Sequence, residues 1–181
     1  AGTSPKTFQG GLKRDCDEHG EVMPSRRTAD GRGKKLADFV ADESARMANL
    51  TDADVAALRF YTTAAFRSIN DPLRDTARRE RNEPHPLPLT CKLVDIAVGK
   101  LRAIGAYSAH ASDAIDLYRG LKNVKVPDAF LRRGGTELAP MSTTNDLKIA
   151  IRYGATGDEC ILLKLRTRSS MERGADLTYL C

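Results

Sequence analysis

Apolar residues recur at helical spacing through much of the first half of the chain. The segment 36–50 has an apolar side made of Leu36, Phe39, Val40, Met47 and Leu50, with the small Ser44 among them. The segment 51–66 repeats the pattern with Val55, Leu58, Thr62 and Phe66. This periodicity is typical of amphipathic helices that bury one side against a core. We therefore predict helices over both segments.

Residues at the ends of these segments add start and stop signals. Thr51 stands three residues before Asp54, which resembles a capping box, although Asp replaces the usual Glu or Gln. A third helix is predicted over 89–105, which ends on a glycine and has an apolar side formed by Leu93, Ile96, Ala97, Leu101 and Ile104. The charged, proline-rich segment 74–89 predicts an exposed loop, because proline interrupts both helices and central strands.

After residue 113 the pattern changes to short apolar runs bounded by turn residues. The segments 114–120 and 160–168 predict strands, and 136–144 is a weaker third candidate. The segment 145–154 predicts a short helix that begins near Asn145 or Asp146 and has on one side Leu147, Ala150 and Ile151. Helices followed by strands, with one helix inserted, indicate an α+β fold.

The composition is that of one globular domain. Of 181 residues, 41% are hydrophobic and 29% charged, which is enough to bury a core. No apolar run approaches the roughly 20 residues of a membrane span, and the start of the sequence lacks the hydrophobic region of a secretory signal. Residues 1–34 show no periodicity and predict a flexible polar leader before a domain over 35–181. The net charge of +5 favours anionic ligands without choosing among them.

Cysteine and histidine residues show no metal-binding spacing. Cys16 and His19 are close enough to supply two ligands, but nothing nearby supplies the others, so no metal site is predicted. Cys91 and Cys160 lie within apolar stretches, which predicts buried and reduced thiols. Reduced thiols favour an intracellular setting.

Two short patterns point to an anionic ligand. Arg119 ends an apolar run and is followed by Gly120. Arginine offers a planar fork of donors that suits a phosphate, and glycine lets a ligand approach the backbone. A row of hydroxyls precedes the predicted helix, formed by Ser142, Thr143 and Thr144. The residues alone leave other roles open, because Arg119 would also suit an ion pair with Asp116 and the hydroxyls would suit a helix cap.

These patterns together resemble a known family. The segments 59–74 (RFYTTAAFRSINDPLR), 117–121 (LYRGL) and 141–144 (MSTT) occur in an order and spacing similar to those of arginine-specific mono-ADP-ribosyltransferases. The resemblance is to the Arg–Ser–Glu class, which is related to vertebrate ecto-transferases and bacterial binary toxins. It covers about residues 36–181. It implies N-terminal helices followed by a mixed β-sheet core, with NAD-dependent transfer of ADP-ribose to arginine of a protein acceptor.

The resemblance also implies roles for individual residues. Arg119 would contact the phosphate and ribose of NAD, and Gly120 would offer backbone hydrogen bonds to the nicotinamide amide. A Ser-Thr-Ser motif, which supports the cleft and helps to orient the catalytic glutamate, is matched by Ser142, Thr143 and Thr144. The third position departs from the motif, because threonine replaces serine.

A helical signature near the cofactor is matched by Tyr61 and Asn70. Helix packing and a turn hydrogen bond are the alternative roles for these two side chains. The sequence does not decide between those roles and contact with NAD.

The third motif of the family, a Glu-x-Glu pair, has no match in this sequence. In the family, the final glutamate stabilises the oxocarbenium-like transition state, and the first orients or activates the acceptor guanidinium. The motif would follow the run matched by 174–181, so the resemblance predicts a fold that lacks its last strands. Glu159 and Glu172 are poor substitutes and are expected to be surface carboxylates. We therefore expect little or no transfer by this chain, with Ser142 in a supporting role only.

Two other classes of function stay open on this reasoning. One is a non-catalytic module that binds NAD or a protein partner through the same cleft. The other is a basic nucleic-acid-binding domain, which is disfavoured because no known motif is present and aromatic residues make up only 6% of the chain. Saturable NAD binding without turnover would indicate the first, and strongly salt-dependent binding to DNA would indicate the second.

Overall fold

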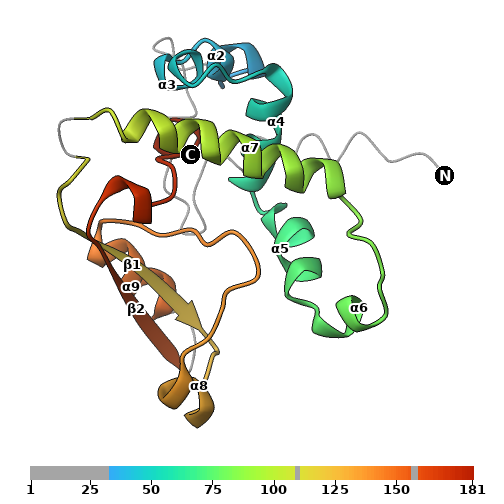
Figure 1. Cartoon of the computed structure of the whole chain (residues 1–181), viewed down its shortest axis with the longest axis vertical. Helices are drawn as coiled ribbons and strands as arrows, with labels where there is room; N and C mark the ends of the chain where they lie inside the picture. The colour runs from blue at the N-terminus through green and yellow to red at the C-terminus, as the bar shows by residue number, and fades with distance from the viewer. Residues whose placement is uncertain (1–32, 109–110, 156–158) are drawn as a thin grey trace.

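The computed structural model describes residues 33–108, 111–155 and 159–181. Helices from the first half of the chain gather in one part of the molecule, and the strands lie beside a later helix in the other part (Figure 1). The α+β class predicted from the sequence is confirmed. The predicted leader over 1–34 lies almost entirely outside the described residues, as do Cys16 and His19.

The segment 36–50 forms two short helices rather than one. They are α2 (Leu36–Val40) and α3 (Glu43–Met47), and the Asp42 side chain caps α3 by accepting from the Ser44 amide at 2.9 Å. This break rotates the second helix, so Met47 is 62% exposed although it was predicted to share the buried side with Phe39. Asp42, a residue type that favours helix caps, marks this break in the sequence, but the apolar spacing continues across it.

The predicted capping box at the start of the next helix, α4 (Asp52–Tyr61), is confirmed. The Asp54 amide donates to Thr51 Oγ1 at 3.2 Å, and the Thr51 amide donates to Asp54 Oδ2 at 3.0 Å. The same Asp54 oxygen accepts from Lys100 Nζ at 2.7 Å, which ties α4 to α7. The helix ends at Tyr61, so the prediction that it continues to Phe66 is wrong.

Three further helices complete this part of the molecule: α5 (Phe66–Arg74), α6 (Thr76–Glu80) and α7 (Pro88–Gly105). The predicted loop over 74–89 is wrong in part, because Asp75 accepts from the Arg78 amide at 3.0 Å and so caps the short helix α6. The predicted helix over 89–105 is confirmed within one residue. Its buried positions are Val94, Ala97 and Leu101, whereas Ile96 is 39% exposed.

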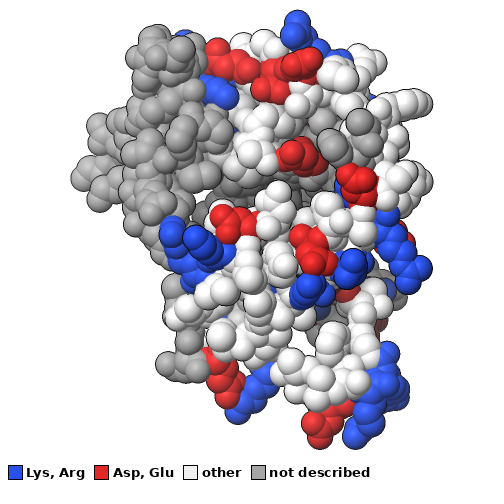
Figure 2. Space-filling model, turned by 90° about the vertical axis from the view of Figure 1, so that its left-hand side faces the viewer, with Lys and Arg blue, Asp and Glu red and all other residues white. Residues whose placement is uncertain are grey.

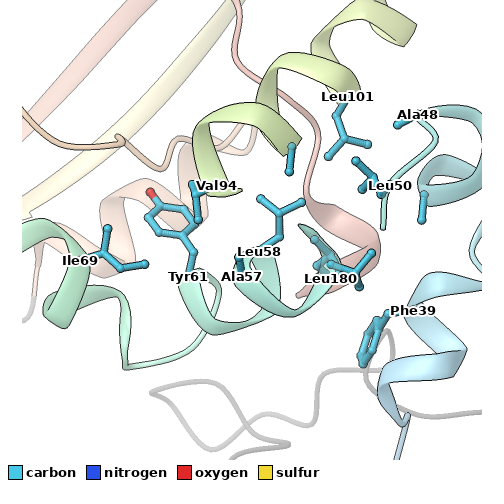
Figure 3. Close-up of a cluster of buried hydrophobic side chains, with 13 residues drawn as sticks. Phe39, Ala48, Leu50, Ala57, Leu58, Tyr61, Ile69, Val94, Leu101 and Leu180 are labelled. Carbon is cyan, nitrogen blue, oxygen red and sulfur yellow. The ribbon is translucent and has the colours of Figure 1, made fainter. Parts of the chain in front are cut away.

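The hydrophobic core lies between α4, α7 and the C-terminal turn η4 (Thr178–Leu180) (Figure 3). Leu58 of α4 and Leu180 of the turn are both fully buried. Arg59 donates to the carbonyl of Leu180 and stacks over the Phe39 ring at 4.5 Å from its centroid. Residues from both ends of the described chain therefore share one core with α4.

The second part of the molecule contains a two-stranded antiparallel sheet of β1 (Ile115–Lys122) and β2 (Cys160–Thr167). Arg119 lies opposite Leu163 in the register. Both strands were predicted, but the described sheet is smaller than the mixed sheet that the resemblance implied. The segment 136–144 forms no strand and contributes only a bridge between Thr144 and Tyr118.

The remaining elements flank the sheet. They are α8 (Asp128–Arg133), α9 (Leu147–Gly154) and the short turn η3 (Ser170–Glu172). Helix α9 packs on β1, and its capping residue is Asp146, one of the two positions at which the helix was predicted to begin. Its predicted apolar side is buried only at Ala150, since Leu147 and Ile151 are 40% and 49% exposed.

The predicted environments of the cysteines are wrong for Cys160 and only partly right for Cys91. Cys160 begins β2 and is exposed, whereas Cys91 is half-buried in α7. Burial raises the pKa of the Cys91 thiol. None of the described helices is long and apolar enough to cross a membrane.

The central position of α4 in the core can be tested by truncating one side chain. Leu58→Ala is expected to lower the free energy of unfolding by about 2–5 kcal/mol, because it removes a fully buried side chain and leaves a cavity. Leu89→Ala is the matched control, since Leu89 is 70% exposed in α7 and its loss is expected to cost less than about 0.5 kcal/mol. Urea unfolding followed by circular dichroism measures both, and equal losses would contradict the placement of Leu58.

Candidate functional site

The candidate site is built around residues 137–144, which we call the 137–144 segment. It runs from α8 towards α9 without regular structure and passes between α5 and β1. The carbonyls of Pro140 and Ser142 accept from side chains elsewhere in the chain, and Thr144 pairs with Tyr118 of β1. The contacts of this segment bring together most of the residues that the sequence singled out.

Arg119 extends from β1 to the 137–144 segment. Its Nη1 donates to the backbone carbonyl of Ser142 at 3.0 Å. The alternative ion pair with Asp116 is wrong, because Asp116 accepts from Lys164 Nζ at 2.8 Å on the neighbouring strand. The guanidinium is half-buried, and burial lowers the pKa of Arg119. The one hydrogen-bonding partner that Arg119 has among the described residues is thus a neutral carbonyl, which leaves its charge uncompensated by a direct carboxylate.

A second arginine lies near this guanidinium. Arg74 of α5 binds Glu137 with two parallel hydrogen bonds of 3.0 Å each. This hydrogen bonding lowers the pKa of Glu137, and the Ala139 amide donates to the same carboxylate at 3.0 Å. The positive charge of Arg74 acts with burial to lower the pKa of Arg119. Two guanidinium groups therefore lie close together, and the Glu137 carboxylate acts on both of them.

Tyr61 and Asn70 hold the middle of the 137–144 segment. The Tyr61 hydroxyl and Asn70 Nδ2 both donate to the carbonyl of Pro140, at 3.1 Å and 3.2 Å. The Tyr61 hydroxyl also lies 3.0 Å from Ser142 Oγ. Both side chains are buried, whereas Ser142 is exposed. Figure 3 shows Tyr61 at the Ile69 end of the core cluster, so its ring belongs to the core while its hydroxyl serves the site.

The other hydroxyls of the row have backbone and capping roles. Thr144 exchanges two backbone hydrogen bonds with Tyr118, of 2.7 Å and 2.9 Å, and its Oγ1 accepts from the Asp146 amide at 3.1 Å. The cap of α9 is Asp146 itself, which accepts from the Lys148 amide at 2.8 Å. Thr143 is half-buried between Ser142 and Thr144. Capping thus occupies Thr144 and Asp146 and leaves Ser142 for another role.

The packing of α9 requires glycine at position 120, whether or not a ligand approaches the backbone there. A Cβ atom at this position would lie 2.0 Å from the carbonyl oxygen of Ala150 and 2.7 Å from the amide nitrogen of Gly154, both in α9. Backbone polar groups alternate between the two edges of an antiparallel strand. The backbone groups of Tyr118 bond to Thr144. Gly120 lies two residues further along β1, so its backbone groups point to the same edge, next to Ser142. Backbone donors and acceptors are therefore presented beside Arg119 and Ser142.

The carboxylates considered as substitutes for a catalytic pair lie apart from this cluster. Glu159 pairs with Lys125 at 3.0 Å, and Glu172 accepts from the Arg168 amide at 2.8 Å. Both are exposed, as predicted. Among the described residues, no group of three or more His, Cys, Asp or Glu side chains is arranged to hold a metal ion.

Sequence reasoning missed the roles of Arg74, Glu137 and Pro140. These residues act through contacts with partners more than sixty positions away in the chain, and no local pattern marks such contacts. No family model, curated protein or solved structure matches the chain. The interpretation of the site consequently rests on its geometry and on the sequence resemblance.

The close packing of α9 on β1 predicts unequal effects of two glycine substitutions. Gly120→Ala is expected to lower the free energy of unfolding by about 1–3 kcal/mol, because backbone atoms of α9 must move to admit the methyl group. Gly99→Ala in α7 meets nothing within 4 Å and is expected to be neutral or to stabilise by up to about 1 kcal/mol. Thermal and urea unfolding of both variants provide the measurement. A neutral Gly120→Ala would show that α9 does not press on β1.

Proposed function

We propose that this cluster binds the diphosphate and nicotinamide ribose of NAD, in a domain of the arginine-specific mono-ADP-ribosyltransferase type. The observation that carries the proposal is the half-buried Arg119, whose charge faces a second guanidinium and a neutral carbonyl rather than a carboxylate of its own. A phosphate would supply the missing negative charge and accept from the free donors of the guanidinium.

The groups around Arg119 suit the rest of a dinucleotide. The edge of β1 at Gly120 presents a backbone donor and acceptor, which match the carbonyl and amino groups of a carboxamide. Ser142, in the 137–144 segment beside this edge of β1, adds an exposed hydroxyl. These are the positions that the sequence resemblance assigns to NAD binding.

The reaction proposed for this type of domain is transfer of ADP-ribose. An arginine nitrogen of the acceptor protein would bond to the anomeric carbon of the ribose with inversion, and nicotinamide would leave with the electrons of the broken bond. The acceptor guanidinium would release a proton. Positive charge develops on the ribose during this step, and a correctly placed carboxylate is the group that stabilises it.

The Arg119 cluster by itself supplies binding rather than rate enhancement. Arg119, Gly120 and Ser142 would bind the phosphates, the carboxamide and the ribose, but none of them is a carboxylate that could stabilise the positive charge on the ribose, and uniform binding does not accelerate a chemical step. The carboxylates of Glu159 and Glu172 are bound to partners away from the cluster, which favours a second candidate function, NAD binding without transfer. The two candidates share the binding site and differ in turnover.

The surface does not favour nucleic acid as the ligand. On the face shown in Figure 2, Lys and Arg side chains are interspersed with Asp and Glu rather than gathered into one basic surface. Several arginines of α5, α6 and the residue that follows α6 also have carboxylate partners in the structure, as the pairs of Arg74, Arg78 and Arg81 show. The small anion site at Arg119 is therefore the better-supported ligand site.

The binding proposal predicts a loss of NAD affinity on removal of one side chain. Arg119→Ala is expected to weaken NAD binding by about 1.5–3 kcal/mol, the contribution of a charge-assisted hydrogen bond. Arg102→Ala, at an exposed position of α7, removes the same charge away from the site and serves as the control. Isothermal titration calorimetry measures both. Unchanged affinity in a folded Arg119→Ala variant would remove Arg119 from the site.

The chain as given is expected to show little or no transfer of ADP-ribose to arginine and little NAD hydrolysis. Loss of one electrostatic group at a transition state typically costs on the order of a hundred- to a thousandfold in rate. Incubation with labelled NAD and an arginine-rich acceptor provides the assay. Strong label transfer that Glu159→Gln or Glu172→Gln abolishes would identify a carboxylate that we placed outside the site. Transfer that survives both substitutions would contradict the requirement for a glutamate.

A further inference from the structure

The Tyr61 hydroxyl connects the exposed Ser142 hydroxyl to the backbone carbonyl of the half-buried Pro140. It lies 3.1 Å from the carbonyl oxygen of Pro140 and 3.0 Å from Ser142 Oγ. A carbonyl can only accept, whereas each hydroxyl has a single proton to donate. The direction of donation along this row of oxygens can therefore be worked out.

The single proton of Tyr61 belongs to the hydrogen bond with Pro140. If it pointed to Ser142 instead, the lone pairs of the phenolic and carbonyl oxygens would face each other at 3.1 Å without a proton between them. With the Tyr61 proton on Pro140, the 3.0 Å contact is satisfied only if the Ser142 hydroxyl donates to Tyr61. The order of donation is thus Ser142 to Tyr61 to Pro140.

This order determines what Ser142 offers to a ligand. Its proton is committed to Tyr61, so the outward side of Ser142 Oγ presents lone pairs only. Such an oxygen accepts from a hydroxyl or amide of a ligand and repels a phosphate oxygen, which has no proton to donate. Arg119, whose Nη1 donates to the backbone carbonyl of Ser142, offers only donors and suits the phosphate.

We propose that Tyr61 is a positioning residue that makes Ser142 a hydrogen-bond acceptor, so that this side of the site selects a ligand hydroxyl or amide and not a phosphate. The inference rests on the proposed NAD site. It places the phosphates of the ligand at Arg119 and a hydroxyl or amide of the ligand at Ser142. Asn70 keeps a second hydrogen bond on Pro140, at 3.2 Å, which holds the 137–144 segment when the Tyr61 hydroxyl is removed.

The experiment compares two probes, NAD and inorganic pyrophosphate, by calorimetry at one pH near neutrality, where the Tyr61 hydroxyl keeps its proton. Tyr61→Phe and Ser142→Ala are each expected to weaken NAD binding by about three- to tenfold, the effect of one neutral hydrogen bond. Pyrophosphate binding, which depends on Arg119, is expected to stay within about twofold in both variants. The double variant is expected to lose no more NAD affinity than Ser142→Ala alone, because Tyr61 acts through Ser142.

Tyr179→Phe is the matched control, since it removes another phenolic hydroxyl, which is buried without a hydrogen-bond partner among the described residues, in a residue that packs against the same core. It is expected to leave the affinity for both probes unchanged. A Ser142→Ala variant that loses pyrophosphate affinity would show that Ser142 donates to anions, which would overturn the inference. Additive losses in the double variant, or an unchanged NAD affinity in folded Tyr61→Phe, would also overturn it. Wild-type protein that binds no NAD would instead refute the proposed function, and the inference with it.

Discussion

The carbonyl of Pro140 is the point through which the helical part of the molecule holds the 137–144 segment against the sheet. Its two donors come from different helices, Tyr61 from α4 and Asn70 from α5. The same segment then reaches β1 through Ser142 and Thr144. A segment without regular structure needs such partners, because an unpaired buried carbonyl costs as much as a lost hydrogen bond. Satisfying one backbone group therefore also sets the geometry of the site.

Local signals in the sequence predicted the elements that depend on local physics. The capping box at Thr51, the helix that ends at Gly105 and the short apolar strand that contains Arg119 all follow from neighbours within a few residues. The break between α2 and α3 was missed because the apolar spacing continues across it. The absence of a strand over 136–144 was missed because the segment's partners are side chains of distant helices rather than a neighbouring strand.

In the candidate site, too, residues within short sequence patterns were predicted, and contacts between distant residues were not. Arg119, Gly120 and Ser142 were selected from residue types and from the family resemblance, and the structure places all three at one edge of β1. The contributions of Arg74 and Glu137 depend on a contact across 63 positions, which one sequence cannot show. Gly120 illustrates a further limit, because the glycine that suits a ligand is required just as strongly by the backbone of α9.

The contact of α9 with Gly120 divides the site into a part that tolerates change and a part that does not. No larger side chain fits at position 120 without moving a helix, so the β1 side of the site has almost no freedom to vary at this position. The 137–144 segment has no such neighbour at Ser142, which is exposed. Natural variation or redesign of ligand preference would therefore be confined to that segment, while β1 would keep the same shape in every variant that folds.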